Sequence, residues 1–155
     1  VVAAPGEGEQ VSWSPLFDLR LVRGPGTGGD EGARSACSWF RLLEDLGEGP
    51  ASHSAGLAYA SDSGPAWLVH GLHEQACAPE QPWRPISLDH GIWFHRPFRA
   101  DEWLLLEAST NSLHNSIGLA TGRVFSGDGR LVASIAQEVL LRRPRSVPRR
   151  ARTGS

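Results

Sequence analysis

A glutamine in the last apolar stretch of the chain is the first residue whose position suggests chemistry. On a strand, Gln137 would share one face with five apolar residues, which are Leu131, Ala133, Ile135, Val139 and Leu141. Burying an unpaired amide costs roughly 1–3 kcal/mol, so Gln137 should have a hydrogen-bond partner. We expect that partner to be Asp89 or a water molecule. The alternative is a structural amide that bonds to the backbone.

Asp89 is the carboxylate best placed for acid–base chemistry. On a strand it would share a face with Gly91, Trp93 and His95, which places the carboxylate beside a large aromatic ring. Partial desolvation there would make it a stronger general base for a water molecule. The alternative is an aspartate at the start of a strand that accepts hydrogen bonds from backbone amides, and the residues alone favour it.

The sequence predicts neither a metal site nor a cofactor. His90 and His95 flank Trp93, but no third ligand follows at a metal-binding spacing, so we expect His90 to be packed or hydrogen-bonded. Cys37 and Cys77 are far apart and lack C-x-x-C spacing. We therefore expect free thiols in a reducing cytosol and not a disulfide.

The elements that must position these residues are several strands and one helix. Six stretches are predicted as strands: Leu16–Arg23, Cys37–Leu43, Ile86–His95, Glu102–Ser109, Ile117–Ser126 and Arg130–Arg142. The predicted helix, Ala51–His73, lies between the second and third strands, and Gly64-Pro65 should kink or interrupt it. Gly127–Gly129 predicts a tight turn between the last two strands. A helix segregated from grouped strands indicates an α+β fold.

The charge distribution argues against a nucleic-acid-binding protein. The net charge is −2, yet six arginines after Glu138 carry +6, so the rest of the chain carries −8 (−2 less +6). An acidic body with a basic tail does not provide the folded basic face that nucleic acids require. No apolar run approaches the roughly 20 residues that span a bilayer, and no signal-peptide pattern is present, so we expect a cytoplasmic protein without membrane contact.

The segment Ser87–Trp103, SLDHGIWFHRPFRADEW, resembles the second hotdog repeat of the acyl-CoA thioesterase II family. Phe17–Arg20 resembles the opening strand of that repeat, Leu57–Asp62 its central helix and Gly127–Glu138 its last hairpin. The resemblance runs from Leu16 to Arg142. It implies a hotdog fold, an antiparallel sheet of about five to six strands wrapped around one central helix.

The resemblance also implies a set of catalytic residues. In that family an Asp, a Thr or Ser, and a Gln orient the water that attacks the thioester. Asp89 and Gln137 match the first and the last of these. An ungapped count places Asn111 at the middle position, whereas strand alternation favours Thr110, which would lie on the more apolar face unless a bulge intervenes. We predict Asn111, with Thr110 as the alternative.

The resemblance divides the chain into three parts. Residues 1–15 are expected to be a flexible segment, 16–142 a single hotdog domain and 143–155 a basic, disordered tail. In the family this repeat is the second of two, so the chain is predicted to form a homo-oligomer or to pair with another hotdog domain.

The resemblance implies a function and leaves two alternatives. The implied function is hydrolysis of a fatty acyl-CoA to a fatty acid and CoA. One alternative is a non-catalytic hotdog half that serves structure or acyl binding. The other is a hotdog hydratase or dehydratase, for which His53 and Asp62 are the candidate residues.

Overall fold

The computed structural model describes residues 4–11, 14–23, 35–76 and 83–142. Its helices are α2 (Pro50–Ser61) and α3 (Ser63–Ala76). Its strands are β1 (Glu9–Gln10), β2 (Phe17–Arg23), β3 (Ser35–Leu42), β4 (Arg84–Ser87), β5 (Gly91–Phe94), β6 (Leu104–His114), β7 (Ile117–Ser126) and β8 (Leu131–Arg142). The basic tail and the loop between β2 and β3 lie outside the described residues.

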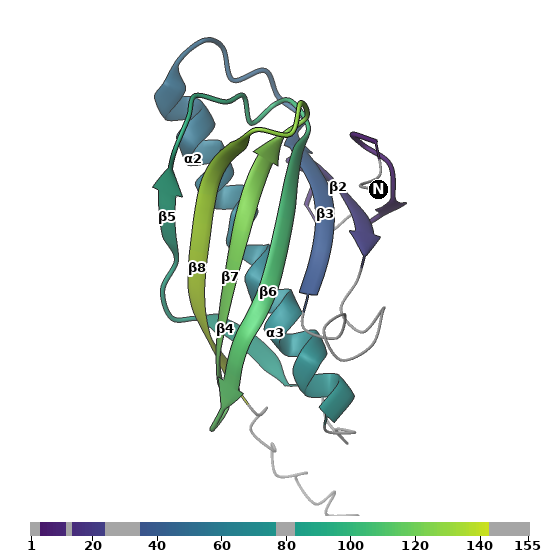
Figure 1. The fold of residues 1–155 in the computed structure, drawn as a ribbon, viewed down its shortest axis with the longest axis vertical. Helices are drawn as coiled ribbons and strands as arrows, with labels where there is room; N and C mark the ends of the chain where they lie inside the picture. The colour runs from purple at the N-terminus through teal and green to yellow at the C-terminus, as the bar shows by residue number, and fades with distance from the viewer. Residues whose placement is uncertain (1–3, 12–13, 24–34, 77–82, 143–155) are drawn as a thin grey trace, which may run out of the picture.

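All the described strands belong to one antiparallel sheet that curls around the two consecutive helices (Figure 1). The strand order is β1-β2-β3-β6-β7-β8-β4, and β5 also pairs with β8. The predicted α+β hotdog arrangement is therefore confirmed. The described sheet has eight strands instead of five to six, because the expected strand Ile86–His95 divides into β4 and β5, and Glu9–Gln10 adds a short strand beside β2.

The core lies between the concave face of the sheet and the helices. Its largest fully buried side chains include Phe40, Leu57, Leu68, Leu104 and Ile135. Leu57 and Leu68 come from the two helices and the others from β3, β6 and β8. The central helix thus buries its apolar face against strands that are distant in the sequence.

The predicted helix is interrupted, and the interruption places a polar residue, Asp62, between its two parts. We expected a kink or an interruption at Gly64-Pro65, and an interruption is found just before these residues, because α2 ends at Ser61 and α3 begins at Ser63. Pro65 has no N–H to donate to the carbonyl of Ser61, four residues earlier, so the regular hydrogen-bond ladder stops there. Asp62 keeps helical dihedral angles (φ −60°, ψ −35°), so the chain continues in the same direction across the break. Asp62 is the one residue there that belongs to neither helix.

The turns of the β6-β7-β8 meander follow from local chemistry. Asn115 and Ser116 both have positive φ (48° and 64°), as a two-residue type I′ hairpin requires. Gly129 has φ 83°, and its N–H donates to the carbonyl of Ser126, which confirms the predicted turn. These turns set the register that places β6, β7 and β8 side by side under the helices.

Gly118 of β7 lies where α3 packs closely against the sheet. A Cβ added there would overlap the Cγ1 atom of Val69 and lie 3.1 Å from its Cγ2 atom, and Val69 is fully buried. We predict that Gly118→Ala lowers the free energy of unfolding by about 1–3 kcal/mol through overpacking. Urea denaturation measures this change. Gly127→Ala is the control, because its Cβ would lie 3.6 Å from the nearest heavy atom; equal losses in both variants would contradict the prediction.

Asp101 holds the segment before β6 against the loop that leads into α2. It accepts hydrogen bonds from Arg99 (2.8 and 3.0 Å) and from the N–H of Leu46 (3.1 Å), and its side chain is 10% exposed. The hydrogen bonds from Arg99 lower the pKa of this carboxyl below 3.8.

A lowered pKa means that the folded state favours the ionised form of Asp101. This stabilisation is present above pH 3.8 and is lost as the pH falls through the lowered pKa. We therefore expect Asp101→Asn to reduce stability at neutral pH, and the difference from wild type to shrink in strong acid. Thermal unfolding over a pH series measures it; a difference that grows on acidification would refute the assignment.

Candidate active site

Gln137 lies on the buried face of β8, as its sequence pattern predicts. Its side chain is 0% exposed, and its neighbours on that face, Ala133, Ile135, Val139 and Leu141, are also buried. The amide is hydrogen-bonded at both ends. Its Nε2 donates to Asp62 Oδ1 (3.0 Å) and to Ser87 Oγ (2.6 Å), and its Oε1 lies 3.0 Å from His90 Nδ1. Gln137 is therefore the centre of a polar cluster inside an apolar surrounding.

Asp62 reaches Gln137 from the break between α2 and α3. Its side chain is half-buried, and the preceding residue, Ser61, is fully buried. Because Pro65 ends the α2 hydrogen-bond ladder at this point, the sequence itself places two polar residues where the helix crosses β8.

Ser87 and His90 come from the segment that joins β4 to β5. Ser87 is the exposed last residue of β4 and pairs with Val139 of β8. His90 is half-buried, and its Nε2 lies 3.0 Å from the hydroxyl of Ser61. The polar cluster of Ser61, Asp62, Ser87, His90 and Gln137 thus joins the helix, the edge of the sheet and β8.

Asp89 makes a hydrogen bond to the backbone, which is the contact that the residues alone favoured. Its side chain is exposed, and its Oδ1 accepts a hydrogen bond from the backbone N–H of Glu138 (2.8 Å). The expected pairing of Asp89 with Gln137 is corrected, because both hydrogens of the Gln137 amide go to Asp62 and Ser87. The neighbouring N–H of Leu88 donates to the carbonyl of Glu138, so Asp89 anchors the start of this segment to β8.

Thr110 and Asn111 lie on opposite faces of β6. Thr110 is 3% exposed and its hydroxyl has no hydrogen-bond partner among the described residues, whereas Asn111 is exposed and accepts a hydrogen bond from Thr121 (2.8 Å). A bulge follows Thr110, yet Thr110 stays on the apolar face. Thr110, Ala120 and Gln137 form one row across three strands, so two strand spacings, about 10 Å, separate Thr110 from Gln137.

His53 and Asp62, the candidates for a hydratase, belong to separate environments. They are nine positions apart, which corresponds to about 13 Å along a helix axis. His53 is 4% exposed, its Nε2 lies 2.9 Å from the carbonyl oxygen of Gly47, and its Nδ1 accepts from the N–H of Ala100 (3.2 Å). Its ring therefore bridges two loops and does not face Asp62.

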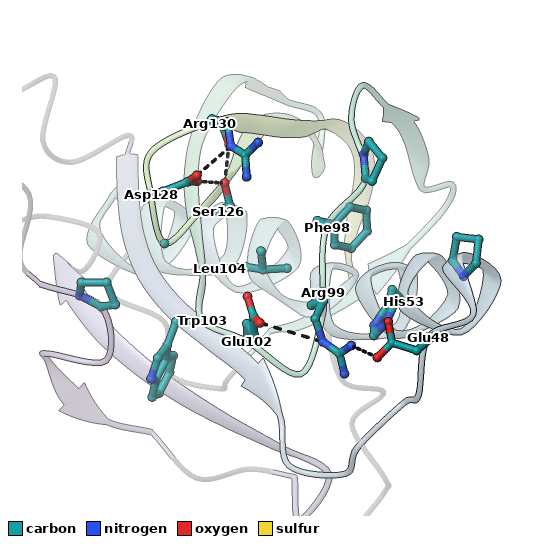
Figure 2. Close-up of a pocket in the computed structure, with 14 residues that line it drawn as sticks. Glu48, His53, Phe98, Arg99, Glu102, Trp103, Leu104, Ser126, Asp128 and Arg130 are labelled. Carbon is teal, nitrogen blue, oxygen red and sulfur yellow. Dashed lines mark hydrogen bonds and ion pairs between the residues drawn. The ribbon is translucent and has the colours of Figure 1, made fainter.

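Two cavities lie away from the polar cluster. One, of about 710 Å³, contains Arg99 and Arg130, and Figure 2 shows both paired with acidic side chains, Glu48 and Glu102 for Arg99 and Asp128 for Arg130. Each positive charge in this cavity is thus already partly neutralised by the protein.

The other cavity, of about 400 Å³, is mostly apolar and lies between the helices and strands β2, β3 and β6. The helix residues that line it are Ala60, Ser63, Gly64, Trp67, Leu68, His70 and Gly71. At 3.6 residues per turn, Asp62 points about half a turn away from Ala60, Gly64, Trp67 and Gly71, and about a quarter to a third of a turn away from the other three. The apolar cavity therefore lies mainly on the side of the central helix that faces away from Asp62.

The described residues contain no group of three or more His, Cys, Asp or Glu side chains that could hold a metal ion. In the same part of the chain, neither helix is long and apolar enough to cross a bilayer.

The sequence of this chain is similar to proteins of one known family. The family model described as "Acyl-CoA thioesterase C-terminal domain" matches residues 1–141. Human acyl-coenzyme A thioesterase 8 is 38% identical over 108 residues, which cover 67% of this chain and 32% of that protein. Acyl-CoA thioesterase 2 of Haemophilus influenzae is 36% identical over 105 residues, covering 68% and 36%.

The fold comparison agrees with the sequence comparison. The crystal structure of the acyl-CoA thioesterase II TesB2 from Mycobacterium marinum superposes with a TM-score of 0.70 at 34% identity, covering 96% of this chain and 57% of that one. The chain spans about a third of the length of the curated relatives it matches. By sequence and by fold, it belongs to the acyl-CoA thioesterase C-terminal domain family.

Proposed function

We propose that this domain hydrolyses acyl-CoA thioesters to a fatty acid and CoA at the site formed by Asp62, Ser87 and Gln137. The observation that carries the proposal is the buried amide of Gln137, which donates one hydrogen to a carboxylate and the other to a hydroxyl. Membership in the family supports the reaction class. The contacts of Gln137 support the choice of residues.

The contacts of Asp62, Ser87 and Gln137 support a different role for each side chain in the proposed reaction. Asp62 uses Oδ1 for Gln137, and its Oδ2 is left to accept a proton from a water molecule. Ser87 accepts from Gln137, so its own hydroxyl hydrogen is left to donate to the thioester oxygen. Gln137 is fully buried and holds the other two side chains in place.

The reaction that follows is a general-base hydrolysis. The water oxygen bonds to the thioester carbonyl carbon while Asp62 takes its proton, and the oxyanion that forms accepts the hydrogen bond from Ser87. The C–S bond then breaks, releasing the acid and the CoA thiolate, which recovers a proton from Asp62 or from solvent. This sequence needs no covalent acyl-enzyme.

The roles predicted from the sequence for Asp89, Asn111 and Thr110 remain predictions that compete with this assignment. Asp89 and Asn111 already hold structural hydrogen bonds, and Thr110 is buried about two strands away from Gln137. The other competing hypothesis is the non-catalytic hotdog half.

We further propose that a second hotdog sheet, from another copy of this chain, pairs with the β4-β5 edge. This edge ends the strand order and carries four exposed apolar side chains, which are Ile86, Leu88, Trp93 and Phe94. Ser87 and His90 lie on the same edge, whereas the apolar cavity lies across the helix. A partner at this edge would supply apolar surface next to the proposed site.

Replacing Asp62 tests the assignment of the general base. We expect Asp62→Asn to lower kcat by about 100-fold or more, because a positioned base contributes on that scale. The measurement is release of free thiol from acyl-CoAs of several chain lengths, with the fold monitored by circular dichroism.

Asp89→Asn is the matched control, since an asparagine carbonyl can still accept the N–H of Glu138. It should retain most of the activity. Loss of activity in Asp89→Asn with activity kept in Asp62→Asn would reverse the assignment. A wild-type chain that releases no thiol from any substrate would favour the non-catalytic hypothesis.

Two tryptophans of equal exposure test the proposed edge. Trp93 on β5 is 56% exposed and Trp67 on α3 is 57% exposed. We expect Trp93→Asp to convert a dimer into a monomer, because a charge would be buried at the edge, whereas Trp67→Asp leaves the dimer intact. Light scattering after size-exclusion chromatography gives the masses. A monomeric wild-type chain, or a dimer lost only in Trp67→Asp, would rule out this interface.

A further inference from the structure

We propose that His90 is a positioning residue that fixes the orientation of the Gln137 amide. The inference rests on the proposed function, because the amide matters through the carboxylate of Asp62 and the hydroxyl of Ser87 that it holds. His90 has no assigned role in the reaction described above. Its ring nevertheless contacts the one end of the Gln137 amide that the reacting groups leave unused.

The hydrogen bonds of His90 select a single neutral tautomer. Nδ1 lies 3.0 Å from Gln137 Oε1, and an amide carbonyl oxygen only accepts, so Nδ1 must carry a hydrogen. In the neutral ring Nε2 is then an acceptor, and the hydroxyl of Ser61 at 3.0 Å supplies the hydrogen. Ser61 is fully buried, so solvent does not compete for this contact.

This tautomer and Asp62 act on opposite ends of the same amide. A flipped amide would set its NH2 group against the N–H of His90 and its carbonyl oxygen against the carboxylate of Asp62. Both contacts would be repulsive, because each would join two donors or two acceptors. The observed orientation satisfies both ends, and only this orientation directs two N–H groups at Asp62 and Ser87.

The same contacts exclude His90 as the base in the reaction. Both ring nitrogens are occupied, one by Gln137 and one by Ser61. Ser87 takes its described hydrogen bond from Gln137 and not from His90. The effect of His90 on turnover therefore passes through Gln137, whose buried oxygen would be left unpaired if the ring were removed.

A pair of isosteric substitutions tests the inference. The amide nitrogen of asparagine lies at the position of Nδ1 and can still donate to Gln137, whereas leucine has the same shape and no donor. We expect His90→Leu to lower kcat by about 10- to 100-fold with KM changed less than about twofold, since small misplacements cost on this scale. His90→Asn should keep kcat within about threefold of wild type. Equal losses in the two variants, or no loss in His90→Leu, would overturn the inference.

The tautomer itself gives a readout that does not depend on activity. Nitrogen-15 NMR of the imidazole of His90 should show the hydrogen on Nδ1 in the wild-type chain, and Gln137→Leu should weaken that preference. A hydrogen on Nε2 in the wild type would overturn the inference. If the tautomer is as expected but Asp62→Asn remains active, the proposed function fails while the orienting contact of His90 stands.

Discussion

The buried amide of Gln137 is the constraint on which the rest of the site depends. A primary amide has two donors and one accepting oxygen, and leaving any of them unpaired inside the protein costs about 1–3 kcal/mol. Here the donors go to Asp62 and Ser87 and the oxygen faces His90. Satisfying one side chain thus brings together groups from the helix, the edge of the sheet and β8.

The helix break is the second structural requirement. Pro65 interrupts the hydrogen-bond ladder at the carbonyl of Ser61, so Ser61 ends α2 and Asp62 lies between the two helices. An apolar residue at the position of Asp62 would offer β8 a hydrophobic surface, and one N–H of the Gln137 amide would lose its carboxylate partner. The break in the helix backbone is therefore also the place where the buried amide of Gln137 meets its carboxylate partner, Asp62.

The polar cluster lies at the same edge of the sheet that we propose as the interface with a second copy of the chain. Ser87 and His90 follow the strand that ends the sheet, and the exposed side chains of Trp93 and Phe94 lie on the same edge. The two cavities described within the chain lie elsewhere. In the function that we propose, the polar groups come from one chain, and room for the acyl group beside them would be provided by the partner that covers this edge.

The sequence by itself determined four features. They are the family, which follows from the segment Ser87–Trp103, the α+β class, the buried face of β8, and the position of Thr110 on the apolar face of its strand. All four depend on the local order of residues or on the alternation of side chains along a strand. It did not determine which carboxylate and hydroxyl meet Gln137. Asp89 and Ser87 are two residues apart, and Asp62 is 75 residues from Gln137 in the chain. Only the tertiary structure decided this, because the choice depends on how the interrupted helix crosses β8 and on where β4 ends, neither of which has a local periodicity.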